Sequence, residues 1–341
     1  PELLVGTFPF APITGDFDSN GKEDIVVVSE FGTETPSVTS FLNQGGGMLE
    51  RHTSNFTNYP YILLVGDFNS DGRLDLLSVV LFFGNSYEFL AGNGDGTFRD
   101  HPAQALPVAY VAGSGDLNND GKPDLILLKD AVVQIMLGNG DGTFGPPTSF
   151  DTGPAENQTF AIADLNRDGN LDLVFTGNGE ISVLRGNGDG TFQRSITSNA
   201  QQAFTTMTIA DLNSDGKPDI AGTATGLVGI LFGKGDGTFQ PQVDYALVSR
   251  DTLAVADFNL DGKLDLAVSQ PFVGLRTLLL NQGNGTFGPQ EDYFDGYRSG
   301  NDRDRILAVG DFNNDGMPDI ARTQDNNYSS TLNLLLSTGR K

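Results

Sequence analysis

The sequence of 341 residues contains no cysteine, no tryptophan and only two histidines. Without cysteine, disulfide frameworks, thiol catalysis and zinc–thiolate sites are excluded. No apolar run approaches the ~18 residues that a membrane helix needs, so no transmembrane span is predicted. Basic side chains are also scarce, because 20 Lys and Arg stand against 44 Asp and Glu and give a formal net charge of −24. This balance argues against nucleic acid as a partner, since nucleic-acid binding requires a basic face.

The acidity belongs to a folded protein rather than to a disordered tail. Apolar residues make up 38% of the chain and charged residues only 19%, a composition that can bury a core. No signal peptide is evident, and because the chain begins at Pro1 rather than Met we expect a mature or trimmed product.

The acids are concentrated in a nine-residue motif, Asp-x-Asp/Asn-x-Asp/Asn-Gly-x-x-Asp, which we call the acidic loop, with positions 1 to 9. It occurs seven times, at residues 16–24, 67–75, 116–124, 164–172, 211–219, 257–265 and 311–319. Successive loops begin 46 to 54 residues apart, and a period of this size predicts a solenoid, a propeller or an array.

A second motif, which we call the glycine string, recurs between the acidic loops. It reads Gly-Asn-Gly-Asp-Gly-Thr-Phe at 92–98, 138–144 and 186–192, varies at 233–239 and 281–287, and has decayed at 43–49. The intervening apolar runs, such as 74–80 and 131–137, are short, rich in β-branched residues and bounded by turn residues, which is typical of strands. No sustained 3.6-residue periodicity predicts a long helix.

About four strands per repeat predict the blade of a β-propeller. We therefore expect an all-β fold, with residues 1–341 forming one seven-bladed propeller domain of four antiparallel strands per blade. The last repeat ends where its glycine string would begin, so it lacks a fourth strand. Residues 2–7 resemble the segment that follows a glycine string, and we expect them to complete the last blade and close the ring; the alternative is a frayed N-terminus.

The spacing of the acidic loop predicts calcium binding. Oxygen ligands at positions 1, 3 and 5, a turn at Gly6 and a carbonyl at position 7 match the first half of an EF-hand loop. Here an Asp at position 9 closes the site as a strand begins, so the site is strand–loop–strand. Magnesium is less favoured because it keeps its waters and binds through few carboxylates. The alternative, a set of solvated Asp/Asn/Gly turns, leaves like charges crowded together without a cation.

Each loop contributes four side-chain ligands in this prediction. They are Asp16, Asp18, Asn20, Asp24; Asp67, Asn69, Asp71, Asp75; Asp116, Asn118, Asp120, Asp124; Asp164, Asn166, Asp168, Asp172; Asp211, Asn213, Asp215, Asp219; Asp257, Asn259, Asp261, Asp265; and Asp311, Asn313, Asp315, Asp319. The position 7 carbonyls belong to Lys22, Arg73, Lys122, Asn170, Lys217, Lys263 and Met317. Up to seven Ca²⁺ ions are expected.

The glycine strings have a phosphate-cradle alternative, which requires a following helix. A strand is predicted to follow, and Asn-Gly or Asp-Gly between strands predicts a hairpin turn. We expect the final Phe of each string to pack between blades.

The acidic loop of 66–75, Gly-Asp-Phe-Asn-Ser-Asp-Gly-Arg-Leu-Asp, together with the glycine strings, resembles FG-GAP or VCBS repeats. Phe144-Gly-Pro and Phe287-Gly-Pro echo the Phe-Gly part of that name, whereas the Gly-Ala-Pro part is not evident. Such repeats form the propeller of integrin alpha subunits and of many secreted bacterial proteins, and the seven matching loops are more similar to the bacterial type. The resemblance implies a calcium-stabilised propeller outside the cell, secreted, on the cell surface or in the periplasm, acting in adhesion by binding a protein. A fungal lectin family of this architecture makes carbohydrate the alternative.

The connections on the face opposite the acidic loops are longest in blades seven, one and two, which are neighbours in a closed ring. Loops on a rigid scaffold are common binding sites, so we predict a surface for a protein or glycan built from residues 29–37, 80–88, 295–305 and 322–330. Its candidate ligand-binding residues are Phe31, Phe82, Phe83, Tyr87, Tyr297, Arg298, Arg303, Arg305, Arg322 and Tyr328. The alternative is that these arginines only pair with Asp302, Asp304 and Asp325. We expect a monomer.

Catalysis has little support in the sequence. His52 and His101 each follow a glycine string and are expected on outer strands, away from any recognisable nucleophile. A carboxylate pair for a polysaccharide-acting enzyme could lie among the 44 acids, but the clustered acids are assigned to calcium. The sequence therefore predicts a binding protein rather than an enzyme.

Overall fold

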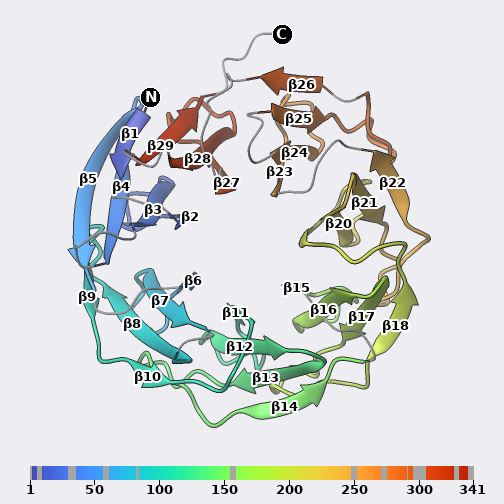
Figure 1. Ribbon diagram of the computed structural model, residues 1–341, viewed down its shortest axis with the longest axis horizontal. Helices are drawn as coiled ribbons and strands as arrows, with labels where there is room; N and C mark the ends of the chain where they lie inside the picture. The colour runs from blue at the N-terminus through green and yellow to red at the C-terminus, as the bar shows by residue number, and fades with distance from the viewer. Residues whose placement is uncertain are drawn as a thin grey trace.

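The structure, a computed structural model, describes residues 2–5, 10–29, 36–56, 61–81, 84–153, 159–246, 252–269, 275–289, 291–294, 305–325 and 330–336. Within these ranges every regular element is a strand, and the strands form seven antiparallel sheets arranged around a ring (Figure 1). The predicted all-β, seven-bladed propeller is confirmed.

Each blade runs from an inner strand near the ring axis to an outer strand on the rim (Figure 1). The inner strands are β2 (Phe10–Gly15), β6 (Ile62–Gly66), β11 (Val111–Gly115), β15 (Thr159–Ala163), β19 (Thr206–Ala210), β23 (Leu253–Ala256) and β27 (Arg305–Gly310). The second strands are β3 (Asp24–Ser29), β7 (Asp75–Val80), β12 (Asp124–Lys129), β16 (Asp172–Gly177), β20 (Asp219–Ala224), β24 (Asp265–Ser269) and β28 (Asp319–Asp325).

The third strands are β4 (Ser37–Gly45), β8 (Ser86–Gly92), β13 (Val132–Met136), β17 (Glu180–Leu184), β21 (Leu227–Leu231), β25 (Leu275–Leu279) and β29 (Ser330–Leu335). The outer strands are β5 (Met48–Asn55), β14 (Thr148–Asp151), β18 (Ile196–Asn199), β22 (Val243–Ala246), β26 (Glu291–Phe294), β1 (Glu2–Val5) and, in the second blade, the pair β9 (Phe98–Asp100) and β10 (Gln104–Ala105).

The outer strand of the second blade is interrupted, since β9 and β10 both pair with β8. Pro102 lies between the two pieces, and proline has no N–H to donate to the ladder. This blade therefore departs locally from the four-strand pattern.

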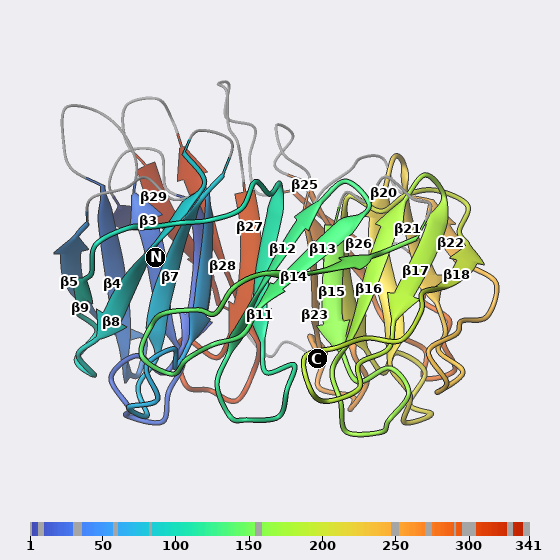
Figure 2. The same cartoon turned by 90° about the horizontal axis from the view of Figure 1, so that it is seen from below.

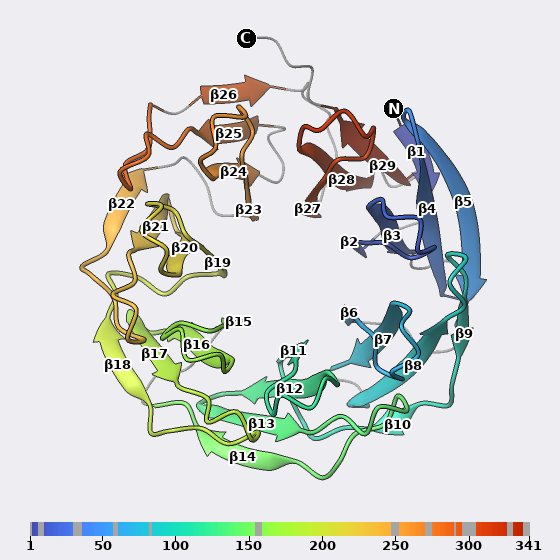
Figure 3. The same cartoon turned by 180° about the vertical axis from the view of Figure 1, so that it is seen from behind.

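The N-terminal strand β1 is the outer strand of the last blade. It pairs antiparallel with β29, with Glu2 opposite Asn333 and Val5 opposite Ser330, and Figures 1 and 3 show it at the junction with the first blade. Val5 shares an apolar cluster with Ile25 of the first blade and Leu332 of the last. This pairing agrees with the predicted ring closure over Glu2–Val5; residues 6 and 7 of that prediction lie outside the described ranges.

The core lies between the blades rather than within one layer. The second strands are buried on both faces, as in Ile25–Val28, whose side chains are fully buried. One cluster joins Val26 of the first blade to Leu76 of the second. Because both faces pack against neighbouring sheets, these strands have continuous apolar runs rather than alternating ones.

The antiparallel order of the strands sorts the connections into two ends of the ring. Acidic loops join first to second strands and glycine strings join third to fourth strands, so both motifs lie at the same end. Figure 2, in which the ring is seen edge-on, shows the strands running between the two ends. In the part of the chain that the structure describes, no helix has the length and apolar character needed to cross a bilayer.

Candidate metal sites

The seven acidic loops share one backbone conformation. Position 4 has a φ of 56–63° in every loop, whether the residue is Ser70, Arg167 or Leu260, and Gly at position 6 has a φ of 79–88°. Two left-handed residues so close together wind the loop tightly, and glycine is the residue that adopts such φ values most easily. The motif spacing therefore reflects one repeated local structure.

The polar side chains of each loop turn inward onto its own backbone. In the second loop Asp67 Oδ1 accepts the N–H of Asp71 at 3.0 Å, and Asp67 Oδ2 accepts the N–H of Gly72 at 2.9 Å. Asn69 Oδ1 also accepts from Asp71, and Asp71 Oδ1 accepts from Arg73. The last loop repeats these four bonds. The side chains of positions 1, 3 and 5 are thus each held against the backbone of their own loop.

The Asp at position 9 is buried and fixes the loop to the glycine string. Asp75 is 0% exposed; its Oδ2 accepts the N–H of Phe68 at 2.9 Å and its Oδ1 accepts the N–H of Gly92 at 2.8 Å. Oδ2 also accepts the N–H of Asn69 at 3.2 Å, so it is Oδ1 that keeps a further lone pair for another partner. The first two of these bonds are also made by Asp24, Asp124, Asp172, Asp219 and Asp265.

Burial makes the ionised form of these carboxylates unfavourable. Desolvation raises the pKa of Asp24, Asp75 and Asp219 to about 6, and the neighbouring loop carboxylates raise it further while backbone N–H groups oppose the shift. The pKa of Asp124, Asp172 and Asp265 is raised by the same cause. A buried carboxylate of this kind is stabilised in its charged form by a nearby cation.

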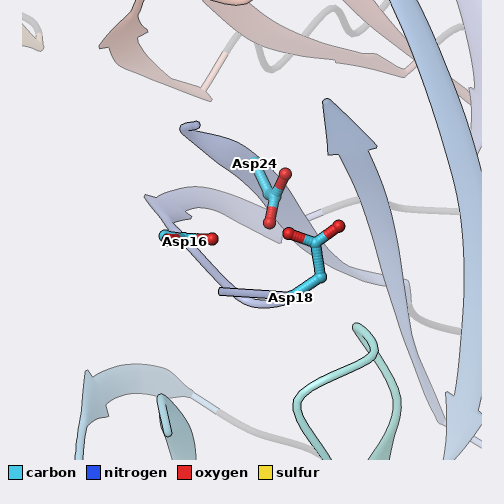
Figure 4. A group of neighbouring side chains, drawn as sticks. All are labelled: Asp16, Asp18 and Asp24. Atoms are coloured by element: carbon cyan, nitrogen blue, oxygen red, sulfur yellow. The ribbon is translucent and has the colours of Figure 1, made fainter. Parts of the chain in front are cut away.

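The first loop gathers three carboxylates in one place. Asp16, Asp18 and Asp24 each offer an oxygen within 4.8 Å of the others, and Figure 4 shows these side chains converging. Position 3 is Asp here and position 5 is Asn20, whose amide donates to Asp18 at 2.9 Å. An oxygen-only set of this composition fits a hard divalent cation such as calcium.

Lysines at position 7 lie against the carboxylate at position 5. Lys217 is 3.0 Å from Asp215 and Lys263 is 3.1 Å from Asp261, both at partly exposed positions. Their side chains therefore stay on the outside of the loop, which agrees with the expectation that position 7 offers only its carbonyl.

The glycine strings are turns that also connect neighbouring blades. Asp95 Oδ1 accepts both the N–H and the hydroxyl of Thr97, which closes the turn. Gly96 then donates to the carbonyl of Phe17, at position 2 of the acidic loop of the preceding blade. Phe98 is buried, with its ring centroid 5.8 Å from that of Phe17. The predicted hairpin turn and the packing of Phe between blades are confirmed.

Sequence reasoning missed the residues at position 2. Phe68 is buried and its N–H donates to Asp75, so it anchors the loop to the core. The available signal was the large apolar side chain at this position in every loop: Phe17, Phe68, Leu117, Leu165, Leu212, Phe258 and Phe312.

Most of the predicted ligand surface lies outside the described residues. This holds for Phe31, Phe82, Phe83, Tyr297, Arg298, Arg303 and Tyr328, while Arg305 lies in β27 with its side chain outside the description. Arg322 is half-buried on β28. The prediction for Tyr87 is wrong. Its side chain is 2% exposed, with its ring centroid 5.3 Å from that of Phe144, because on β8 it faces the third blade. It belongs to the core.

Of the two histidines predicted on outer strands, His52 lies on one and His101 lies just after one. His52 is on the outer strand β5, 3.3 Å from Glu50, and His101 directly follows β9, with its ring centroid 5.0 Å from that of Phe89. Neither is brought beside an acidic loop by these contacts.

Comparison with known families gives a match over most of the chain. The FG-GAP-like repeat matches residues 16–78, 116–175, 164–222 and 211–268, and the FG-GAP repeat matches residues 250–287. A search among curated proteins gives no match.

Solved propellers of different activities share the fold. A lectin of Agrocybe aegerita that recognises non-reducing terminal N-acetylglucosamine is 24% identical, with 87% of this chain and 83% of that chain covered and a TM-score of 0.62. BBS1N in complex with ARL6DN is 11% identical, with 98% and 95% covered and a TM-score of 0.65. The periplasmic gluconolactonase PpgL of Pseudomonas aeruginosa is 13% identical, with 94% and 87% covered and a TM-score of 0.62. At these identities the likeness concerns the fold alone.

Proposed function

Because the chain belongs to the FG-GAP-like repeat family and its seven acidic loops share one conformation, we propose that it is a non-catalytic binding module stabilised by calcium, with up to seven ions held by the acidic loops. The module acts outside the cytoplasm, at the cell surface, secreted or in the periplasm. Its partner is a protein bound in adhesion, on the face opposite the acidic loops. It works as a monomer and does not bind nucleic acid.

The observation that carries the calcium assignment is the repeated burial of a carboxylate against a tight acidic loop. Asp75 is fully buried beside Asp71, whose charge opposes its ionisation. A divalent cation shared by positions 1, 3, 5 and 9 reverses that repulsion. Seven such ions would add 14 positive charges to the formal −24 and leave −10. More than half of the excess negative charge of the sequence then belongs to carboxylates that bind metal.

The extracellular assignment follows from the same chemistry. Loops of hard oxygen ligands in extracellular modules bind calcium with Kd values on the order of 10⁻⁴–10⁻³ M. Such sites fill where calcium is abundant, and the fold is then stabilised by mass action. A module of this kind is rigid in calcium and presents its loops to a partner.

We propose that the protein is not catalytic because of where its histidines and clustered acids lie. His52 and His101 lie on the rim of the first two blades, and the clustered acids belong to the acidic loops. The second candidate function is that of a calcium-stabilised lectin; the observation in its favour is the likeness to the N-acetylglucosamine-binding lectin of Agrocybe aegerita.

Calcium titration tests the proposal. Isothermal titration of the chelator-treated protein with CaCl₂ is expected to give a stoichiometry well above one and up to seven, and EDTA is expected to lower the melting temperature substantially. Heat of binding no larger than the dilution control, together with a melt unchanged by EDTA, would falsify the calcium assignment. An array of glycans and extracellular-matrix proteins probed in calcium separates the adhesion function from the lectin function.

A further inference from the structure

A cavity of about 590 Å³ opens on the rim between the third and fourth blades. Phe150 and Asp151 of β14 form one wall, and Phe192, Arg194 and Ser195, which precede β18, form the other. Figure 1 shows β14 and β18 as successive outer strands. The volume lies within the roughly 300–1,000 Å³ range of small-molecule sites.

In three of the glycine strings the final Phe gives its N–H to a hydroxyl of the preceding blade. Phe98 donates to Ser54 Oγ at 2.9 Å, and Phe287 donates to the hydroxyl of Tyr245 at 3.2 Å. Phe144 donates in the same way to the hydroxyl of Tyr87. At these three boundaries the protein itself supplies the acceptor.

The boundary between the third and fourth blades lacks that hydroxyl. Phe150 stands where Tyr245 stands, because each lies opposite a valine of its third strand. Its ring meets Phe192 edge to face at 5.2 Å and 79°, against 5.4 Å and 84° for Tyr245 and Phe287. Among the described residues none accepts the N–H of Phe192, and Phe192 is one of the residues that line the cavity.

A short side chain keeps the cavity open. Ser195 is three residues after Phe192, and in the next blade Gln242 is three residues after Phe239. Gln242 bridges two segments of the rim, since its Oε1 accepts the N–H of Gln201 at 3.2 Å and its Nε2 donates to Asp244 at 2.6 Å. Serine is too short to do this.

The lining offers donors and acceptors of balanced charge beside two aromatic rings. Asp151 and Arg194 both face the cavity, and within the described part of the chain they form no ion pair with each other. Ser195 and Thr197 add hydroxyls, which both donate and accept. Opposed charges disfavour a strongly charged ligand, whereas a hydroxyl-rich ring can use a carboxylate, a guanidinium and an aromatic face together.

We propose that this cavity binds a neutral saccharide residue, one hydroxyl of which accepts the N–H of Phe192 in place of the missing protein hydroxyl. Asp151 and Arg194 bind further hydroxyls, and a ring face of the sugar lies on Phe150 or Phe192. The site lies on the rim and uses no acidic-loop residue, so it rests on the second candidate function, that of a lectin, and depends neither on calcium binding nor on the opposite face.

The test uses two substitutions that copy sister blades. Phe150→Tyr brings the hydroxyl that Tyr245 supplies, and Ser195→Gln brings the longer side chain that Gln242 provides in the next blade. The probes are the methyl glycosides of glucose, galactose, mannose, N-acetylglucosamine and N-acetylgalactosamine, titrated in calcium by isothermal calorimetry. The wild type is expected to bind at least one glycoside and to shift the amide resonance of Phe192. Each variant is expected to weaken that binding roughly tenfold or more, which corresponds to about 1.4 kcal/mol.

The matched control is Tyr245→Phe, which changes the same contact at another boundary and is expected to leave glycoside binding unchanged. Retained circular dichroism of both pocket variants keeps the comparison valid. The inference is overturned if no glycoside binds the wild type, or if binding survives both pocket substitutions. Calcium titration reports on the acidic loops alone, so failure of one proposal is distinguishable from failure of the other.

Discussion

The hydroxyl of Tyr245 accepts a hydrogen bond from the backbone N–H of Phe287 at 3.2 Å, across the boundary between the fifth and sixth blades. Their rings meet edge to face, with centroids 5.4 Å apart. Neighbouring blades are therefore joined by polar bonds at the rim in addition to the apolar clusters between sheets. Phe98 and Ser54 form the corresponding bond between the first two blades.

Tyr245→Phe is expected to lower the free energy of unfolding by about 1 kcal/mol, the usual contribution of one hydrogen bond. The ring contact with Phe287 is preserved, so the loss of stability measures the contribution of the hydroxyl alone. Urea denaturation in saturating calcium measures it. Phe150→Tyr, which adds the missing hydroxyl opposite Phe192, is the reciprocal variant and is expected to raise the free energy of unfolding by a similar amount. Equal stability of all three proteins would show that these bonds contribute nothing.

Asp75→Asn is expected to remove one calcium ion from the stoichiometry and to destabilise the fold by about 1–3 kcal/mol. Both oxygens of Asp75 accept backbone N–H groups, from Phe68 and Gly92. An asparagine turns an NH₂ group toward one of these donors, which leaves a buried donor without an acceptor. Calorimetric titration counts the ions, and urea denaturation measures the stability.

Asp95→Asn is the matched control for that experiment. Asp95 is an exposed acid of a glycine string and bonds Thr97 through Oδ1, which an asparagine oxygen can replace. We expect an unchanged calcium stoichiometry and almost unchanged stability. A loss of calcium from this variant as large as that from Asp75→Asn would assign the metal to general surface acidity instead of the acidic loops.

The stability of the calcium-free protein is expected to rise as the pH falls from about 7 to about 5. Asp24, Asp75 and Asp219 have a folded pKa of about 6 against an ordinary 3.8, so the folded state binds protons more tightly than the unfolded state. Their contribution is fully present below pH 3.8 and is lost as the pH rises through 6. The exposed acids Asp95 and Asp141 have a lowered pKa, so their contribution to the stability changes with pH only near and below pH 3.8. Melting curves in EDTA measure the effect.

Calcium is expected to reverse the sign of this pH dependence. The cation binds the ionised loops, so protons compete with it and stability in saturating calcium falls as the pH is lowered. Parallel melting curves in CaCl₂ and in EDTA at each pH provide the comparison. Superimposable curves in the two solutions would contradict calcium binding by the acidic loops.

Leu260→Asn is expected to stabilise the protein by roughly 1 kcal/mol, the cost that a left-handed conformation imposes on an ordinary side chain. Leu260 has a φ of 58° and is 55% exposed, so its side chain gains little from packing. Asn119 and Asn314 occupy the same position in two sister loops. The difference in unfolding free energy in saturating calcium measures the effect, and a destabilised variant would show that Leu260 packs usefully.

The fold and the acidic loops could be predicted from sequence because their determinants are local. Positions 1 to 9 of each loop lie on one short turn, so the spacing of the acids and the glycine specifies which side chains converge. The bond from Asp75 to Gly92, 17 residues away, was not predictable in this way. It depends on how the third strand is aligned against the second.

Contacts between blades could not be predicted from the sequence for a related reason. Tyr87 was predicted on a binding surface, yet its place on β8 turns it toward Phe144. Strand side chains alternate between faces, so a register must be known before a surface residue can be told from a buried one. The cavity beside Phe150 likewise depends on which residue of the next blade lies opposite it, and that residue, Phe192, is 42 positions away.

Gly138→Ala is expected to destabilise the third blade by about 1–3 kcal/mol, the usual cost of overpacking. A Cβ added at Gly138 would lie 2.3 Å from the carbonyl oxygen of Pro123, and the N–H of Gly138 is already held by buried Asp124. Neither the carbonyl nor the glycine can move without breaking the bond that joins the glycine string to the acidic loop. Gly145→Ala, seven residues later, meets its nearest atom at 3.6 Å and serves as the control, with an expected change near zero. Urea denaturation compares the two variants. Because the glycine string holds Asp124 in place, the acidic loop of the third blade is expected to bind calcium more weakly in Gly138→Ala, which calcium titration measures. An undisturbed affinity would mean that this acidic loop keeps its geometry without the string.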